Sequence, residues 1–490
     1  MKVAFVTPEL HSLVRRTNLA SVAQDLARAL RSANADCRVF MPNTKDVEQD
    51  KLTDLERIAT VPIESPDGRV VFDILRGNLD GLPVFLFDQA QLFGGRHPYG
   101  DEDGPYEDNW KRYALFSRAV LASFPSLDFP ADVIHGLDWT FGTLPLFHQL
   151  HYLGQNEGLA AERAGTFFSI HNLAMQGSFE REILPRIGVP HEYFRQVEGM
   201  EVNGKVNFLK TGAEFATVIG THSPTHALKI QEQDRGYGLE DTFQRRKKEL
   251  IGIHNGVDYA AWNPSTDPLL AAPFGAKGSS IAGKRKCKAD LQTSLQLDGS
   301  DKTLLACHIG RWDADSGFDL LAEVLALILE HDVELVAMGA GGEEITRRLR
   351  TIEGTFVGRV RIIEGYDAAA AHRLMAGSDV LLMPSHYQPS NPLFAIALRY
   401  GVLPIVYSES GLEDTMPDAE SGKGGLSFHF DPYTGDGLLA SVLRAAQVHK
   451  DGPAWEKLVE RALSQDYSWE RTAADYLKAY RRVTRRIRGR

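Results

Sequence analysis

The sequence predicts an α/β protein built from two doubly wound parallel sheets. Three observations lead to this fold class: short apolar runs that alternate with amphipathic segments, a length of 490 residues, and an ordinary composition with 43% hydrophobic and 24% charged residues. Short apolar runs bounded by turn residues are typical of strands buried on both faces, and strands that alternate with helices usually pair in parallel. The length fits two large domains of this kind.

The first part of this pattern opens the chain. Residues 2–7 form an apolar run that leads into Pro8, residues 19–34 carry apolar side chains at helical spacing, and residues 36–42 form a second strand. A strand, a helix and a strand in succession predict a right-handed crossover in a parallel sheet. The apolar stretch Val3–Val6 is too short for the core of a signal peptide, so we expect a cytoplasmic protein.

The same alternation continues along both halves of the chain. Further strands are expected at 132–135, 166–170, 303–309, 333–338, 359–364 and 380–383. Helices are expected between the later strands at 317–331, 342–351, 368–376 and 393–400. The two halves meet at residues 254–264, a segment rich in Asn, Gly and Pro that suits a linker, and residues 265–300 are expected to form a loop and one helix.

Charge and cysteine content narrow the class of protein. With 65 acidic and 54 basic residues the net charge is −11, which argues against a general nucleic-acid binder or a binder of anionic membranes. Cys37, Cys287 and Cys307 lie far apart, so neither a disulfide framework nor a cysteine zinc site is expected, and a reducing compartment fits best. No apolar run approaches the roughly 18 residues that a membrane-spanning helix needs.

A series of motifs in matching order resembles the bacterial glycogen synthase and plant starch synthase family. In the first half these are HPYGDEDGPYEDN (97–109), DVIHGLDWTFG (132–142), FSIHNLAMQG (168–177), VNGKVNFLKTG (202–212), THSPTHA (221–227), YGLED (237–241) and HNGVDYAAWNP (254–264). In the second half they are GRWDADSGFDLL (310–321), MGAGGE (338–343), the segment 365–389, YGVLPIV (400–406), SGLEDT (410–415) and QDYSWERTAADYL (465–477). The resemblance covers almost the whole chain.

The resemblance implies the GT-B fold, in which two doubly wound Rossmann-like domains flank an interdomain cleft. The expected domains are an acceptor-side domain at 1–255, a nucleotide-sugar-side domain at 256–465, and a last helix within 466–490 that returns to the first domain. The implied activity is retaining transfer of glucose from ADP-glucose to the end of an α-1,4-glucan, with no metal and no other cofactor. The implied partners are therefore a nucleotide sugar and an α-glucan, with no nucleic acid and no membrane, and the oligomeric state stays open.

The resemblance also assigns roles to residues at matching positions. The catalytic candidates are His171, Asp138 and Gln388. The candidates for binding the donor nucleotide sugar are Arg15, Arg311, Gly339, Tyr366, Gly411 and Leu412. The candidates on the acceptor side are Asp108, Asn109, Trp139, Asn172 and Gln176, among which Trp139 offers an aromatic face on which a sugar ring can stack.

Several donor-side positions depart from the family's motifs. The family's Lys-Thr-Gly-Gly loop is Arg15-Arg16-Thr17-Asn18 here, and the second histidine of its His-x-His-Asp-Trp motif is Leu137. A phosphate-binding lysine is replaced by Ser316, a glutamate beside the donor sugar by Gln388, and a following glycine by Asn391. Arg15 keeps a positive charge, but Ser316 removes a cation and the lost glycines remove close backbone approach, both of which stabilise a departing diphosphate.

Plain structural roles compete with the functional ones. His135 at a strand end suits a packed histidine, Trp139 suits a core position, Asp138 suits a helix cap, and Gly339 suits the turn after a strand. Three hypotheses therefore stay open: a glucosyltransferase that uses ADP-glucose, a catalytically silent paralogue that binds glucan or a synthase partner, and a transferase with another donor or acceptor. In the last case Arg15, Arg16 and Arg311 would form a rebuilt phosphate site.

Overall fold

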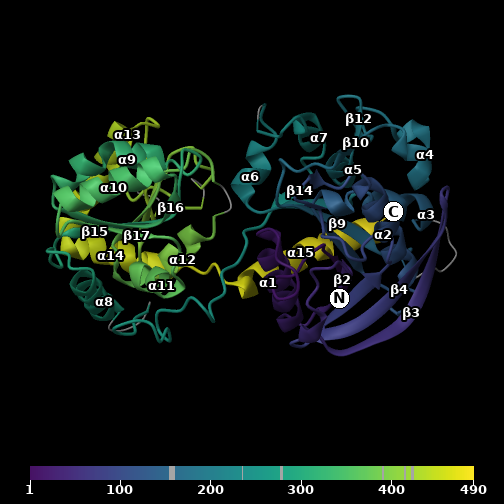
Figure 1. Cartoon of the computed structure of the whole chain (residues 1–490), viewed down its shortest axis with the longest axis horizontal. Helices are drawn as coiled ribbons and strands as arrows, with labels where there is room; N and C mark the ends of the chain where they lie inside the picture. Colours follow the sequence, from purple (N-terminus) through teal and green to yellow (C-terminus); the bar gives the residue numbers. More distant parts are fainter. Residues whose placement is uncertain are drawn as a thin grey trace. The chain divides into compact units, whose positions relative to one another are not determined.

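The chain divides into two compact α/β units, each built around one main sheet (Figure 1). The structure is a computed structural model that describes residues 1–153, 161–233, 235–275, 280–388, 391–412, 415–420 and 424–489. Unit 1 comprises Met1–Gly256 together with Trp469–Arg490, and unit 2 comprises Val257–Ser468. Among these described ranges, no helix is long and apolar enough to cross a membrane.

The main sheet of unit 1 has nine strands in the order β14-β13-β9-β8-β1-β2-β5-β4-β3. Their bounds are β1 Lys2–Val6, β2 Asp36–Pro42, β3 Thr53–Ser65, β4 Gly68–Leu79, β5 Leu82–Asp88, β8 Val133–Leu137, β9 Gly165–Ile170, β13 Val218–Thr221 and β14 Leu250–Gly252. The seven strands from β14 to β5 pair in parallel, and β4 and β3 extend the sheet in antiparallel fashion. The predicted order of strand, helix and strand at the start of the chain is thus present.

Strand β1 shows why this sheet is buried on both faces. Val3 and Phe5 point into a core shared with helices α1 (Leu19–Ser32) and α15 (Trp469–Arg488). Ala4 and Val6 point into a second core that includes residues of helix α2 (Asn109–Ser123). Because successive side chains of a strand alternate between faces, a continuous apolar run fills both cores at once.

The remaining elements of unit 1 are shorter and surround the sheet. The helices are α3 Leu144–His151, α4 Ile183–Ile187, α5 Phe208–Phe215, α6 Pro224–Lys229 and α7 Glu240–Arg245, with 3-10 turns η1 Gln49–Lys51, η2 Trp139–Phe141 and η3 His191–Tyr193. The small strands are β6 Gly100–Asp101, β7 Gly104–Pro105, β10 Ser178–Phe179, β11 Glu201–Val202 and β12 Lys205–Asn207. The parallel strands end at one edge of the sheet, which is where ligands of doubly wound sheets bind.

The β3–β4 hairpin is a feature that the sequence analysis did not predict. Along β3 only Val61 and Ile63 are buried, and most of the other side chains are exposed or half-buried. A strand at the sheet edge with so few buried positions carries no continuous apolar run, so hydrophobic pattern alone gives it no signal.

Unit 2 contains a six-stranded, fully parallel sheet in the order β17-β16-β15-β18-β19-β20. The strands are β15 Leu304–Trp312, β16 Val333–Gly341, β17 Val360–Glu364, β18 Val380–Met383, β19 Leu403–Tyr407 and β20 Phe428–Phe430. The helices are α8 Ser280–Ser294, α9 Phe318–Leu329, α10 Glu343–Thr355, α11 Ala368–Gly377, α12 Leu393–Arg399, α13 Gly435–Lys450 and α14 Gly452–Leu463. Helices α9, α10 and α13 cover one face of the sheet, and α8, α11, α12 and α14 cover the other (Figure 1). The doubly wound fold predicted for this half is confirmed.

Candidate active site

In unit 1, the candidate site residues gather after the carboxyl ends of β8, β9 and β13. Asp138 follows β8, His171 and Asn172 follow β9, and His222 follows β13. Neighbouring parallel strands end at the same edge, so short turns are enough to bring these side chains together.

Asp138 is the centre of this edge. Its Oδ1 accepts hydrogen bonds from the backbone N–H of His171 at 2.7 Å and of Asn172 at 3.2 Å. The side chain makes no capping hydrogen bond to the 3-10 turn that follows it, so the helix-cap role is not observed. Its backbone has φ 56° and ψ −175°, a region that nearly always belongs to glycine. Such strain persists only where the surroundings impose it, and here the two N–H groups hold the carboxyl in place.

Burial changes the acid–base behaviour of Asp138. Removal from water raises the pKa of the Asp138 carboxyl to about 7, although the N–H groups of His171 and Asn172 oppose the shift. Near neutral pH this carboxyl is therefore divided between its protonated and ionised forms. It is the group at this edge best suited to give or take a proton at pH 7.

Three histidines line the same edge. The rings of His222 and His226 stack with centroids 3.9 Å apart, and burial lowers the pKa of His171 to about 4 and that of His226 to about 3. Burial also lowers the pKa of His222 well below its usual value. Within the described part of the chain, the Nε2 atom of His171 and the Nδ1 atom of His222 are buried without a hydrogen-bond partner. Neutral rings with a free nitrogen suit the hydroxyl groups of a sugar better than a phosphate.

His222 and His226 were not singled out by the sequence analysis. Their segment, 221–227, served only as one of the matching motifs. The signal that could have identified His222 is its position directly after a buried strand, the same criterion that selected His171.

His135 has a structural role, and its ring is fully buried. Its Nδ1 pairs with the Tyr480 hydroxyl at 2.7 Å and its Nε2 with Ser169 Oγ at 2.6 Å. Both ring nitrogens are therefore used inside the core between β8, β9 and α15. Leu137, at the end of β8, is also fully buried.

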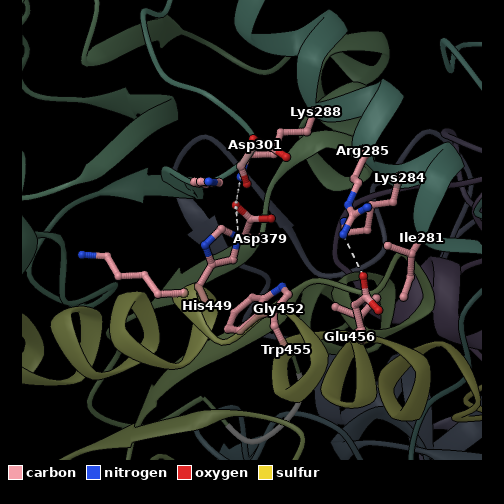
Figure 2. Close-up of a pocket in the computed structure, with 13 residues that line it drawn as sticks. Ile281, Lys284, Arg285, Lys288, Asp301, Asp379, His449, Gly452, Trp455 and Glu456 are labelled. Atoms are coloured by element: carbon pink, nitrogen blue, oxygen red, sulfur yellow. Dashed lines mark hydrogen bonds and ion pairs between the residues drawn. The ribbon is translucent and has the colours of Figure 1, made fainter.

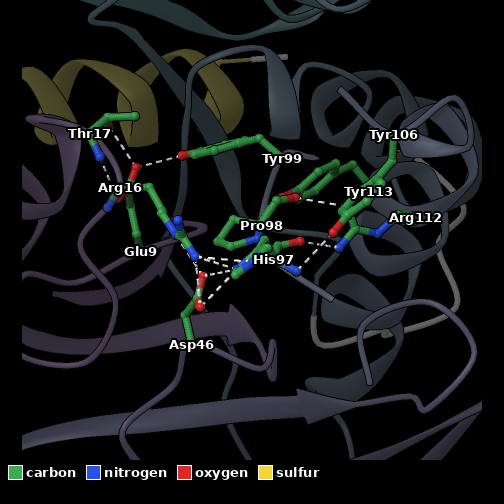
Figure 3. Close-up of polar contacts among 10 residues, drawn as sticks. All are labelled: Glu9, Arg16, Thr17, Asp46, His97, Pro98, Tyr99, Tyr106, Arg112 and Tyr113. Atoms are coloured by element: carbon green, nitrogen blue, oxygen red, sulfur yellow. Dashed lines mark hydrogen bonds and ion pairs between the residues drawn. The ribbon is translucent and has the colours of Figure 1, made fainter. Parts of the chain in front are cut away.

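The loop before α1 donates hydrogen bonds to the buried carboxylate of Glu9 (Figure 3). Glu9 is fully buried, and its Oε2 accepts hydrogen bonds from the backbone N–H of Arg16 at 2.7 Å and of Thr17 at 3.0 Å. Its Oε1 accepts from the hydroxyls of Thr17 and Tyr99, both at 2.6 Å. Two N–H donors of this loop, which could otherwise face a phosphate, are thus already satisfied.

The two arginines of this loop differ in their partners. Arg16 donates to the Asp46 carboxylate through Nε at 2.8 Å and through Nη2 at 2.9 Å, and His97 contacts the same carboxylate at 2.8 Å. Arg15 is exposed to solvent. Of the two guanidinium groups, only that of Arg15 is therefore available to a diphosphate without breaking an existing ion pair.

The acceptor-side candidates Asp108 and Asn109 contact the segment that carries Tyr99, a hydrogen-bond partner of Glu9. Asp108 holds Arg96 through two hydrogen bonds of 2.8 and 2.6 Å. Asn109 is buried and uses its side chain to donate to Tyr99 O at 2.7 Å and to accept from Arg112 at 2.7 Å. Their side chains therefore stabilise the segment that carries Tyr99.

Trp139 and Gln176 are also held by the protein itself. The Trp139 side chain packs against Tyr113 with ring centroids 5.5 Å apart, and the residue is only 7% exposed. A Cβ atom on Gly177 would meet the Trp139 ring at 2.3 Å, so the ring fills the space up to the backbone. This packing leaves Trp139 as a core residue with little surface for a sugar. Gln176 donates to Tyr237 O at 3.0 Å and accepts from Asn207 at 2.6 Å.

In unit 2, Arg311 lies at the carboxyl end of β15, next to the carboxylates of two aspartates. The Arg311 side chain is 70% exposed, and its guanidinium lies 3.2 Å from Asp313 and 4.0 Å from Asp315. Ser316 donates to Asp313 Oδ1 from its N–H at 2.9 Å and from its hydroxyl at 2.7 Å. One cation beside two carboxylates leaves a net negative charge where the resemblance implies a diphosphate.

The other donor-side candidates lie at the same edge of the unit 2 sheet. Gln388 accepts from the Ser385 hydroxyl at 3.0 Å and its N–H donates to Ser410 O at 2.8 Å, next to Gly411. A Cβ atom on Gly339 would meet Gly310 O at 1.8 Å, so strand packing alone requires a glycine there. Tyr366 is 68% exposed, and Leu412 is buried. The neighbours Pro389 and Ser390 lie outside the described residues.

No cluster of three or more His, Cys, Asp or Glu side chains suited to a metal ion occurs within the described ranges. At the carboxyl edge of its sheet, unit 1 offers a titrating carboxyl and neutral histidines. At the corresponding edge, unit 2 offers an arginine and an amide.

Comparisons with known proteins agree with this layout of two units. Residues 2–245 match the family model of the starch synthase catalytic domain, and residues 303–447 match that of the glycosyl transferases group 1. The glycogen synthase of Thioalkalivibrio sulfidiphilus is 34% identical over 98% of this chain and 99% of its own length. Glycogen synthase 2 of Bradyrhizobium diazoefficiens is 36% identical over 98% of both chains. The chain belongs to the glycogen synthase and starch synthase family.

A solved structure extends the match from sequence to fold. The catalytic domain of starch synthase IV from Arabidopsis thaliana, solved bound to ADP and acarbose, has a TM-score of 0.80 and 27% identity, and the match covers 99% of each chain. This glycogen synthase relative therefore has the GT-B fold, and the resemblance drawn from its motifs is confirmed. A likeness to sucrose-phosphate synthase from Thermosynechococcus elongatus, at 14% identity and a TM-score of 0.56, supports the fold alone.

Proposed function

We propose that this chain transfers glucose from ADP-glucose to the end of an α-1,4-glucan, and that it binds its donor weakly. The observation that carries the proposal is the match across both units to glycogen synthases and to a starch synthase structure that holds ADP and acarbose. A relative that matches in both units is expected to take the same two classes of ligand, a nucleotide sugar and a glucan.

In unit 1, the His171–Asp138 pair is the proposed sugar-contacting group. The Nε2 atom of His171 has no partner in the described part of the chain, which leaves it free for a sugar hydroxyl. Asp138 fixes the backbone of His171 and Asn172, so it orients the ring and supplies a carboxyl whose pKa lies near neutrality. Transfer with retention of configuration needs such groups to hold the sugar while the diphosphate leaves.

In unit 2, Arg311 is the proposed diphosphate contact and Gln388 the proposed contact to the donor. Arg311 is largely exposed and can swing toward a ligand, while Gln388 keeps hydrogen-bonding capacity without charge. Asp313 and Asp315 oppose the approach of an anion, and Ser316 contributes no positive charge. A hydrogen bond to a charged group is worth about 1.5–3 kcal/mol, so the missing lysine alone weakens donor binding by about tenfold to a hundredfold.

A second function, glucan binding without transfer, is favoured by one observation. The N–H groups of Arg16 and Thr17 are occupied by Glu9, and Arg16 itself is paired with Asp46. With these contacts in place, Arg15 is the guanidinium of the first loop that is open to a diphosphate.

The test combines nucleotide binding with transfer. Purified protein is titrated with ADP and ADP-glucose by calorimetry, and radioactive glucose incorporation into glycogen is measured in parallel. Weak donor binding with incorporation supports the first function, and retention on glycogen without incorporation supports the second. Absence of both nucleotide and glycogen binding would overturn both.

Arg311→Ala is the variant that tests the donor assignment. We expect it to abolish nucleotide affinity, because it removes the cation at the end of β15. Arg373→Ala is the matched control, since Arg373 is a partly exposed arginine of the same unit that pairs with Asp290 at 3.0 Å. Unchanged nucleotide binding in Arg311→Ala would contradict the assignment.

A further inference from the structure

Figure 2 shows a pocket of unit 2 that is lined by residues of α8, α13 and α14. It lies at the amino edge of the sheet, whereas Arg311 lies at the carboxyl end of β15 and Gln388 follows that of β18. Asp301 lies just before β15 and Asp379 just before β18, and both line the pocket. Its volume is about 330 Å³. No residue of the candidate active site lines it, so its polar groups need a separate explanation.

Among the buried polar side chains that line this pocket, His449 has an unusual environment. Its side chain is 7% exposed, and its Nε2 lies 3.5 Å from Asp379 Oδ2. That oxygen also accepts from Lys288 Nζ at 2.6 Å and from Leu305 N–H at 2.8 Å, which fixes the carboxylate in position. The ring stands edge-on to Trp455 with centroids 5.0 Å apart. His449 is therefore held firmly by its neighbours.

The other ring nitrogen of His449 has no internal role. Its Nδ1 is buried and has no hydrogen-bond partner within the described residues. A buried polar atom without a partner costs free energy, and a ligand that satisfies it recovers that cost. With the Asp379 carboxylate beside Nε2, Nδ1 is the ring nitrogen that is left to a ligand.

The charges of the pocket favour an anion. Five basic residues and three carboxylates line it, which leaves a net charge of +2 with His449 neutral. Lys284 gives its three hydrogens to the carbonyls of Ala376, Ser378 and Tyr400 and is thus occupied. Arg285 is paired with Glu456 at 2.7 Å.

Two ammonium groups remain available to a ligand. Lys302 and Lys450 line the pocket, are exposed, and have no ion pair in the described part of the chain. The two ammonium groups and Nδ1 of His449 together offer three polar contacts, which suits the three terminal oxygens of a phosphate ester.

We propose that this pocket binds a phosphate group, either free or as the monoester of a small metabolite. His449, Lys302 and Lys450 hold the phosphate oxygens. The volume exceeds that of a bare phosphate, and the side chains of Trp455 and Val459 give the rest of a monoester an apolar wall. Because the pocket and the donor-side residues lie at opposite ends of β15 and β18, both ligands can bind at once. The proposal does not depend on whether the chain transfers glucose.

The test is calorimetric titration of the full chain with inorganic phosphate and with glucose 6-phosphate. Lys302→Gln/Lys450→Gln is expected to weaken binding by at least about tenfold, since two charged contacts are lost. Lys286→Gln/Lys457→Gln makes the same charge change at exposed lysines of α8 and α14 outside the pocket, and it is expected to bind as the wild type does.

His449→Phe tests the buried nitrogen. It keeps a ring against Trp455 and removes both ring nitrogens, so phosphate binding should be lost while the thermal unfolding temperature shows that the chain still folds. Tighter binding of glucose 6-phosphate than of phosphate identifies the ester as the ligand, and equal binding identifies free phosphate. Binding that the Lys302/Lys450 variant leaves unchanged, that ADP displaces, or that neither probe shows would overturn the proposal.

Discussion

The raised pKa of Asp138 leads to a test by replacement with asparagine. Asparagine keeps an Oδ1 atom that can accept from His171 and Asn172, but it cannot ionise. In the wild type, burial raises the pKa of this carboxyl to about 7 in the folded chain, against an ordinary value of 3.8 for aspartate. Between these two values the folded chain holds a proton that the unfolded chain has released, so the free energy of unfolding falls as the pH rises.

The size of this effect follows from the shift of the pKa. A pKa unit corresponds to about 1.4 kcal/mol, so the full loss is about 4 kcal/mol and is complete above pH 7. Between pH 5 and pH 8 the part lost is about 3 kcal/mol. The Asp138→Asn variant lacks this dependence of the free energy of unfolding on pH. Its stability relative to the wild type should therefore rise by about 3 kcal/mol from pH 5 to pH 8.

Urea unfolding of both proteins at the two pH values, followed by circular dichroism, measures the difference. All other titrating groups are shared by the two proteins and cancel in the comparison. Parallel pH dependences of wild type and variant would refute the reasoning, since they would mean that Asp138 ionises in the folded chain as easily as in the unfolded one.

Two further predictions concern unit 2. Lys288→Met should lower the free energy of unfolding by about 3–5 kcal/mol, because it leaves the buried Asp379 carboxylate without its lysine. A double variant that also carries Asp379→Asn should lose less stability than the sum of the two single losses. Additive losses in thermal melts would contradict this prediction. Ser316→Lys combined with Gln388→Glu should raise ADP affinity in calorimetry by about tenfold or more, since a phosphate contact is restored. No gain there would mean that the backbone of the donor loops, rather than these two side chains, limits binding.

The parts of the fold that sequence could predict are those with dense apolar runs. The strands expected at 36–42 and 380–383 have those bounds in the structure, and the buried apolar runs Val39–Pro42 and Val380–Met383 lie within them. Strand β15 continues to Trp312, past its expected end at 309, because Gly310 and Arg311 still pair with β16 although they break the apolar run. Hydrophobic pattern thus locates a buried strand better than it locates the strand's end.

The candidate site was predictable in position but not in its contacts. That Asp138 and His171 meet at one sheet edge follows from their places after neighbouring strands. The role of His135 depends on Tyr480, 345 residues away, and no local pattern contains that information. The N–H groups of Arg16 and Thr17 are likewise occupied because the Glu9 carboxylate lies close to them, which only the structure shows.

The position of α15 has a consequence for synthesis of the chain on the ribosome. Tyr476, Tyr480 and Val483 of this helix fill the core that Val3 and Phe5 share with α1, yet they are translated only after all of unit 2. Unit 2 can therefore mature first, while the earlier-made unit waits with an uncovered apolar face that is open to aggregation or to chaperones. A premature stop codon near residue 470 would accordingly damage unit 1 more than unit 2, although all of unit 2 precedes it in the chain.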